Sequence, residues 1–155
     1  AGLNRPTYTW LASLPTDPGA LLRRLAAEIS ADQDARDTPA GERDPDQDAF
    51  EAIGELLRET LMPPRTAAAL YKAAARIPGV SVDADAVDAA GRHGVAIGRE
   101  DAGPMEPLIF HKKTKAFLGE REGAVRDAGH VKKGDLLGVS AVMHRTVVDG
   151  LGQQP

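Results

Sequence analysis

Cysteine is absent from this chain of 155 residues, and aromatic residues make up only 4% of it. The first absence excludes disulfides, thiolate nucleophiles and the common structural zinc sites. It leaves the compartment open, because many exported bacterial domains also lack cysteine. The second absence means that alanine supplies much of the apolar content of 42%. We therefore expect closely packed helices that each bury little area, and ordinary stability.

The chain also lacks a strongly basic surface and a long apolar run. Its net charge is -4, with both signs interspersed, and this argues against nucleic-acid binding, which depends on neutralising phosphates. No apolar run approaches the roughly 18 residues that a membrane span needs, and no signal peptide is recognisable. The sequence begins at Ala1 without a methionine. We expect a trimmed product, which leaves room for a targeting segment upstream.

The first half of the sequence has the spacing of amphipathic helices. One or two helical turns are predicted over residues 7–14, and a longer helix over about residues 18–30, where Leu21, Leu25 and Ile29 share a stripe. Residues 31–45 have no apolar period and many turn formers, which predicts a solvated loop.

Two further helices follow this loop. In the first, apolar residues recur at helical spacing until Met62-Pro-Pro64 stops it. In the second, the prolines provide the start, and Ala67, Leu70, Tyr71, Ala74 and Ile77 form the expected buried face. Pro78-Gly79 ends that helix.

Beyond residue 78 the period changes to that of strands. Val80, Val82 and Ala84 alternate with polar residues, which predicts a half-buried strand, and a turn at residues 88–92 leads to a second strand through Val95 and Ile97. Further along, residues 108–110 and 116–118 are predicted to pair across a polar turn. We also expect a turn at 100–104, a loop at 126–134 and a long last strand through Leu136, Val139, Ala141, Val142, Val147 and Val148.

Together these elements predict an α+β fold. Two or three helices would pack on one face of an antiparallel meander of four or five strands. We expect one domain over residues 1–155, with a helical half at 1–78 and a β-meander half at 79–150.

Four histidines are candidates for acid–base chemistry: His93, His111, His130 and His144. A serine triad needs a nucleophile, a histidine and an acid that converge, and Ser140 in Gly-Val-Ser-Ala-Val has only half of a nucleophile elbow. A hydrolase using His144 or His111 with an acid such as Asp149 is one alternative. The plainer interpretation places the histidines in turns or on sheet faces. No histidine pair has metal-ligand spacing, so no metal and no cofactor is predicted.

Two glycine- and aspartate-bearing clusters also have plain interpretations. Asp83, Asp85 and Asp88 could hold calcium, but the glycine and glutamate of an EF-hand loop are missing, so a solvated strand face and turn is favoured. The stretch Gly91–Gly94, followed by Gly98, has no helix after it to bind a phosphate, and a hairpin is favoured.

The one basic patch is His111-Lys-Lys-Thr-Lys115. It could meet a phosphate or an anionic headgroup, although lysines at a hairpin tip are more often solvated and protect against edge pairing. Tyr8, Trp10 and Phe50 could line a ligand pocket, but in a chain with so few aromatics they are more often packing residues.

Several motifs arrive in an order that resembles an uncharacterised family of membrane-anchored actinobacterial proteins, whose genes often lie beside those of extracytoplasmic-function sigma factors. The segments are Leu-Ala-Ser-Leu-Pro-Thr-Asp-Pro-Gly-Ala-Leu-Leu-Arg-Arg-Leu (11–25), Ala-Arg-Ile-Pro-Gly-Val (75–80), Asp-Ala-Ala-Gly-Arg-His-Gly-Val-Ala (88–96), Leu-Ile-Phe (108–110), Phe-Leu-Gly-Glu (117–120) and Val-Val-Asp-Gly-Leu-Gly-Gln (147–153). The family usually has an aspartate and a proline where this chain has His111 and Lys112, which puts the usual turn chemistry in doubt.

The resemblance implies a place and a role. Family members have a cytoplasmic start, one membrane helix and extracytoplasmic sequence before the Leu-Pro-Thr-Asp-Pro motif, so this chain would be their C-terminal part at the extracytoplasmic face, with the anchor outside it. The architecture is also similar to lipoprotein-carrier and sigma-regulator sensor domains, in which a curved open sheet wraps around an apolar cavity. No catalytic residue comes with the family.

The leading functional hypothesis is a non-enzymatic binding or sensor module linked to envelope signalling, with a protein partner or an apolar ligand and no nucleic acid. The alternatives are a scaffold segment that completes a larger fold, and the hydrolase. A deep apolar cavity between the helices and the sheet would favour ligand capture, whereas a filled core would favour the scaffold.

Overall fold

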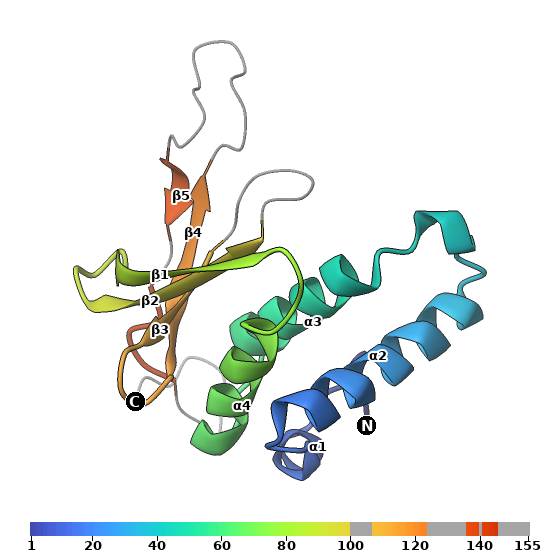
Figure 1. Cartoon of the computed structure of the whole chain (residues 1–155). Helices are drawn as coiled ribbons and strands as arrows, with labels where there is room; N and C mark the ends of the chain where they lie inside the picture. Colours follow the sequence, from blue (N-terminus) through green and yellow to red (C-terminus); the bar gives the residue numbers. More distant parts are fainter. Residues whose placement is uncertain (100–106, 124–135, 140, 146–155) are drawn as a thin grey trace, which may run out of the picture.

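The computed structural model describes residues 1–99, 107–123, 136–139 and 141–145, with the side chains of all of these except 121–123 and 136–139. In this part of the chain the predicted α+β class is confirmed (Figure 1). The helices are α1 (Tyr8–Ser13), α2 (Pro18–Ala35), α3 (Pro45–Glu59) and α4 (Pro64–Ala74), with a 3₁₀ turn at Ala40–Glu42. The strands are β1 (Val80–Val87), β2 (His93–Arg99), β3 (Leu108–His111), β4 (Phe117–Gly123) and β5 (Leu136–Val139).

Local sequence explains where the helices begin. Thr7, Asp17 and Asp44 are N-caps, and their side-chain oxygens accept hydrogen bonds from main-chain amides of the first turns of α1, α2 and α3. A proline occupies the first turn of α2, α3 and α4, where its missing N–H costs no hydrogen bond.

Helix α2 is longer than predicted, because it continues through Ala35 into the expected loop. An ion pair of 2.9 Å between Asp32 and Arg36 spans one turn at the end of the helix, and such pairs stabilise helices. Gln33 adds a hydrogen bond of 2.7 Å to Asp48 on α3. These polar contacts accompany the extra turns of α2, and a pattern of apolar residues cannot predict them.

The sheet is an antiparallel meander in the order β1-β2-β3-β4-β5. The predicted hairpin of residues 108–110 and 116–118 is confirmed. In its register, Ile109 lies opposite Gly119 and Phe110 opposite Phe117. Strands β2 and β3 approach closely at Gly94, where an added Cβ would lie 2.5 Å from the carbonyl oxygen of Phe110. Only glycine fits there without a backbone shift.

Two strand predictions are wrong in detail. In β1, Val82 is 53% exposed and Ala84 is exposed, whereas Ala86 is buried. The strand lies at the edge of the sheet, and a register shift between Asp83 and Ala86 breaks the expected alternation. The last strand ends at Val139, and residues 141–145 are not in a strand.

Other predictions fall outside the described residues. These are the turn at 100–104, the loop at 126–134 and the continuation of the last strand through Val147 and Val148.

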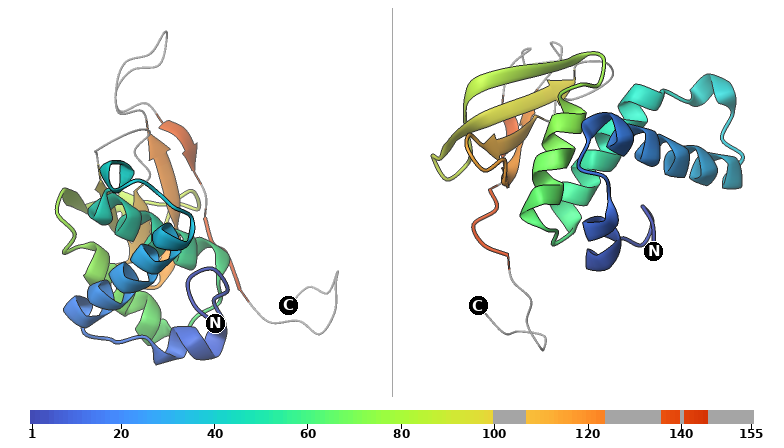
Figure 2. Two further views of the ribbon diagram at one scale, coloured as in Figure 1. Left: turned by 90° about the vertical axis from the view of Figure 1, so that its right-hand side faces the viewer. Right: turned by 60° about the horizontal axis from the view of Figure 1, so that its bottom comes forward.

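The elements form three layers, which Figures 1 and 2 show from different sides. Helices α3 and α4 lie between the sheet and the outer pair α1 and α2. At the contact between helices and sheet, the rings of Tyr71 and Phe110 are 5.0 Å apart and those of Phe110 and Phe117 are 5.8 Å apart, both edge to face. The space between α4 and the sheet is thus filled by aromatic side chains.

The main core joins residues of all four helices to Ile97, Leu108 and Phe110 of the sheet. A smaller cluster of Ala86, Ala96, Ile109 and Leu118 lies on the opposite face, as strand alternation requires. Within the described part of the chain, no helix has both the length and the apolar character that crossing a bilayer would require.

Candidate functional site

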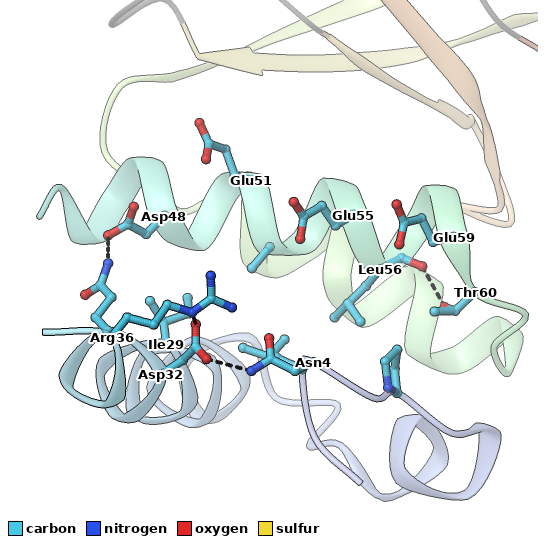
Figure 3. Close-up of a pocket in the computed structure, with 14 residues that line it drawn as sticks. Asn4, Ile29, Asp32, Arg36, Asp48, Glu51, Glu55, Leu56, Glu59 and Thr60 are labelled. Atoms are coloured by element: carbon cyan, nitrogen blue, oxygen red, sulfur yellow. Dashed lines mark hydrogen bonds and ion pairs between the residues drawn. The ribbon is translucent and has the colours of Figure 1, made fainter. Parts of the chain in front are cut away.

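A groove with a volume of about 490 Å³ lies between α2 and α3, next to the N-terminal segment (Figure 3). It lies on the side of α3 where α2 packs, so it is separate from the aromatic contact between α4 and the sheet. Its lining residues are Leu3, Asn4, Pro6, Ile29, Asp32, Gln33, Arg36, Asp48, Glu51, Ala52, Glu55, Leu56, Glu59 and Thr60.

The floor of the groove is apolar. Leu3 and Ile29 are half-buried and pack against the main core, and Leu56 is itself a core residue. The N-terminal segment is held in place by two bonds to α2: the amide of Leu3 donates to Glu28, and the side chain of Asn4 donates to Asp32 at 2.6 Å. The floor is therefore formed where the side chains of Leu3 and Ile29 pack against the main core.

The α3 wall is acidic. Asp48, Glu51, Glu55 and Glu59 line it, and the three glutamates follow one another at four-residue spacing, which puts them in a row on one face of a helix. Figure 3 shows this row along the side of α3. The opposite face of the same helix buries Phe50, Ile53 and Leu57.

The α2 wall is polar and internally paired. Arg36 pairs with Asp32, and Gln33 binds Asp48 at 2.7 Å. The groove thus holds five carboxylates and one guanidinium, a formal charge of -4, and its single cation is already engaged. Within the described residues, the four α3 carboxylates have no cationic partner; Glu51 accepts a hydrogen bond from Gln47 at 2.7 Å.

The groove carboxylates are not arranged as a metal centre. Nowhere in the described ranges do three or more histidine or carboxylate side chains converge as metal ligands. The glutamates are instead spread over two turns of α3, about 12 Å along its axis. Such an arrangement suits several separate cationic groups on an extended or helical ligand.

The histidines of the hydrolase alternative occupy different surroundings. His111 ends β3, and its Nδ1 atom accepts from the amides of Lys113 and Thr114, both at 3.2 Å, so this nitrogen shapes the turn. His93 and His144 are exposed, at the start of β2 and in the segment after β5. His130, Ser140 and Asp149 lie outside the described residues.

The lysine patch is engaged partly within the chain. Lys112 pairs with Asp85 at 2.8 Å, and this hydrogen bond and charge lower the pKa of Asp85. Lys115 lies 5.0 Å from the centre of the Tyr71 ring and also donates to the carbonyl of Lys112. Lys113 is exposed.

The glycine, aromatic and aspartate candidates lie in turns, in the core or on the surface. Gly91 takes a positive φ of 80° in the turn between β1 and β2, which agrees with the hairpin interpretation. Trp10 and Phe50 belong to the core, as expected, whereas Tyr8 is 56% exposed. Asp83 and Asp85 are exposed, but the predicted solvation of Asp88 is wrong, since it is only 6% exposed.

Two arginines that sequence reasoning missed hold the segment 141–145. Arg92 donates to the carbonyls of Leu118 and Val142, at 3.3 and 2.8 Å. Arg145 donates to the carbonyls of Leu57, Arg58 and Thr60, at 2.7 to 2.8 Å. The turn Asp-Ala-Ala-Gly-Arg (88–92) contains a local signal for the place of Arg92, because aspartate often caps its own turn. The carbonyls that Arg145 binds are distant in the sequence, so no local pattern predicts its role.

Comparison with protein-family models, with curated proteins and with the solved structures found no match to this chain.

Proposed function

We propose that this chain is a non-enzymatic binding module and that the groove between α2 and α3 receives a protein partner. The observation that carries the proposal is an apolar floor beside four carboxylates that lack a cationic partner among the described residues. Partly exposed apolar side chains beside carboxylates without a cationic partner, together in one concave site, are features of a recognition surface.

The location and context of the module belong to the same proposal. The motif resemblance supports a place at the extracytoplasmic face, in a membrane-anchored actinobacterial protein linked to envelope signalling. A reporter enzyme that is active only outside the cytoplasm, fused to the parent protein after this chain, tests the location. Activity of the reporter supports it, and silence of a stably expressed fusion contradicts it.

A protein partner is better supported than an apolar ligand. The apolar-ligand version requires a cavity between helices and sheet, and the Tyr71, Phe110 and Phe117 rings pack there. Phe110 is fully buried in this contact.

Site-specific photo-crosslinking tests the binding role. A photoreactive amino acid at Ala52, which lines the groove from α3, should give a discrete adduct in cell-envelope preparations of an actinobacterium. The matched position is Ala116, which is exposed in the β3–β4 turn and should give none. Excess unlabelled chain should suppress the Ala52 adduct. Equal labelling at both positions, or none, contradicts the proposal.

The filled core favours one second candidate, a scaffold segment that completes a larger fold. In that case the groove would be covered by the parent protein's own preceding region. Thermal melts and solution scattering of this chain, alone and joined to that region, separate the two. A large gain in melting temperature, with the Ala52 crosslink formed within one polypeptide, would favour the scaffold.

A further inference from the structure

We infer that the occupant of the groove is a cationic, amphipathic segment of the partner, with an apolar side on the floor and lysine or arginine side chains against Glu51, Glu55 and Glu59. This inference rests on the proposed function and adds the chemistry of the partner. Figure 3 shows the groove and the three glutamates on α3.

Spacing is the first argument. Successive glutamates of the row stand four residues apart, about 6 Å along α3. Cationic side chains repeated every four residues on a partner helix have the same rise, so each could meet one glutamate. A single small cation would leave most of the row without a partner.

Charge is the second argument. Glu51, Glu55 and Glu59 are exposed, and Glu55 and Glu59 make no hydrogen bond or ion pair with the described residues. Like charges at four-residue spacing on a helix repel one another, and a cationic partner relieves that repulsion. On the opposite wall, Arg36 is paired with Asp32, so the cations of the partner should lie along α3.

The floor is the third argument. Leu3 and Ile29 present half-buried apolar surface between the two walls, next to the buried Leu56. An occupant with cationic groups alone would leave this surface in water, whereas an amphipathic segment covers it while its charges meet the rim. Burial on the floor supplies affinity, and the glutamate row supplies orientation and selectivity.

Fluorescence anisotropy with designed probes tests the inference. The probe is a labelled helical peptide of about 12 residues, three turns long, with a leucine stripe and lysines at four-residue spacing beside it. One control peptide replaces the lysines with glutamine, and the other keeps the lysines but replaces the leucines with serine.

The matched protein variants separate the row from bulk charge. The test variant is Glu51→Gln/Glu55→Gln/Glu59→Gln, and the control is Asp37→Asn/Glu42→Gln/Asp83→Asn, three exposed acids outside the groove. Both change the net charge equally. Circular dichroism melts check that both remain folded.

The lysine–leucine peptide should bind the unmodified chain, and binding should weaken as salt rises from about 0.05 M to about 0.5 M. The groove variant should raise its Kd roughly tenfold, because three exposed ion pairs are lost, while the control variant should change it less than about twofold. Both control peptides should bind much more weakly.

Other outcomes overturn the inference in distinguishable ways. Equal weakening by both variants would mean that bulk charge alone attracts the peptide. Equal binding of the glutamine peptide would remove the cationic requirement, and equal binding of the serine peptide would remove the apolar one. If no peptide binds but Ala52 crosslinks to a partner, this inference fails and the proposed function stands; if Ala52 also gives no adduct, both fail.

Discussion

At the residue scale, Asp88 shows how a charged side chain is accommodated inside this fold. Its carboxylate accepts from the amides of Ala90 and Arg92, at 3.0 and 2.8 Å, and from Nε of Arg92 at 2.6 Å. Burial raises the pKa of Asp88, but these hydrogen bonds and the charge of Arg92 outweigh it, and the pKa lies below its ordinary value of 3.8. The charged form is therefore the one that the folded chain stabilises.

We predict that Asp88→Ala lowers the free energy of unfolding by about 2–3 kcal/mol, because it leaves Nε of Arg92 and the main-chain amides of Ala90 and Arg92 without their acceptor. Since the folded pKa is depressed, the contribution of Asp88 is present at neutral pH and is lost as pH falls below 3.8. Urea unfolding at neutral and acidic pH should therefore show a smaller loss on acidification for Asp88→Asn than for the unmodified chain. The exposed control Asp37→Asn should keep the full loss; equal slopes for the two variants would contradict the prediction.

Sequence reasoning at this scale works where the reason is local. The caps at Asp17 and Asp44 and the prolines after them mark helix starts in the sequence and in the structure. The spacing of Asp83, Asp85 and Asp88 predicts three solvated acids, because spacing alone does not show which of them turns inward. The contacts of the turn decide that, because the amides of Ala90 and Arg92 and the Nε of Arg92 donate to the carboxylate of Asp88.

At the scale of elements, α3 connects the other parts of the fold. One face buries core residues, another carries the glutamate row, and its far end is held by Arg145. The guanidinium of Arg145 binds three carbonyls of the last turn and lies 5.8 Å from the Phe117 ring. Burial lowers the pKa of Arg145, but arginine remains charged in proteins and so complements the negative end of the helix.

Replacing Arg145 tests this capping. We expect Arg145→Met to cost about 2 kcal/mol of unfolding free energy, measured by urea denaturation, because three carbonyls lose a charged donor. Arg145→Lys should recover only part of the loss, since a single ammonium cannot reproduce the fork of the guanidinium. The exposed Arg76 provides the control, and Arg76→Met should change stability by less than about 0.5 kcal/mol. Full recovery by lysine would show that charge alone matters.

Element boundaries were predictable only where the sequence itself changes. The hairpin of β3 and β4 follows from an apolar run, a polar turn and a second apolar run, and the structure confirms it. The end of α2 depends on contacts between Arg36, Asp32, Gln33 and Asp48, which no local pattern reports. The groove likewise has no signal in the sequence, because its two walls come from helices whose packing no local pattern specifies.

At the scale of the whole molecule, the helices and the sheet share one core. Tyr71 of α4 meets Phe110 of β3, and Ile97 and Leu108 belong to the same cluster as the helix residues. Arg92 and Arg145 add bonds through the segment 141–145. The class of fold was predictable from the change of period near residue 78, but the close union of its two halves was not, because it depends on side chains that meet only in three dimensions.

This shared core predicts that both halves unfold together. Leu70 of α4 is fully buried, and Leu70→Ala should cost about 3 kcal/mol through lost burial and a residual cavity. Trp10, the one tryptophan of the chain, reports on the helical half through its fluorescence, while amide exchange of Ile97 and Phe110 reports on the sheet. Both probes should report the same decrease in the free energy of unfolding, because a two-state domain has a single value of it. Val82→Ala, at an exposed site of β1, should leave both nearly unchanged. If Leu70→Ala instead shifts only the Trp10 transition and the sheet amides keep their protection, the two halves are separate folding units, and the single domain predicted over residues 1–155 is wrong.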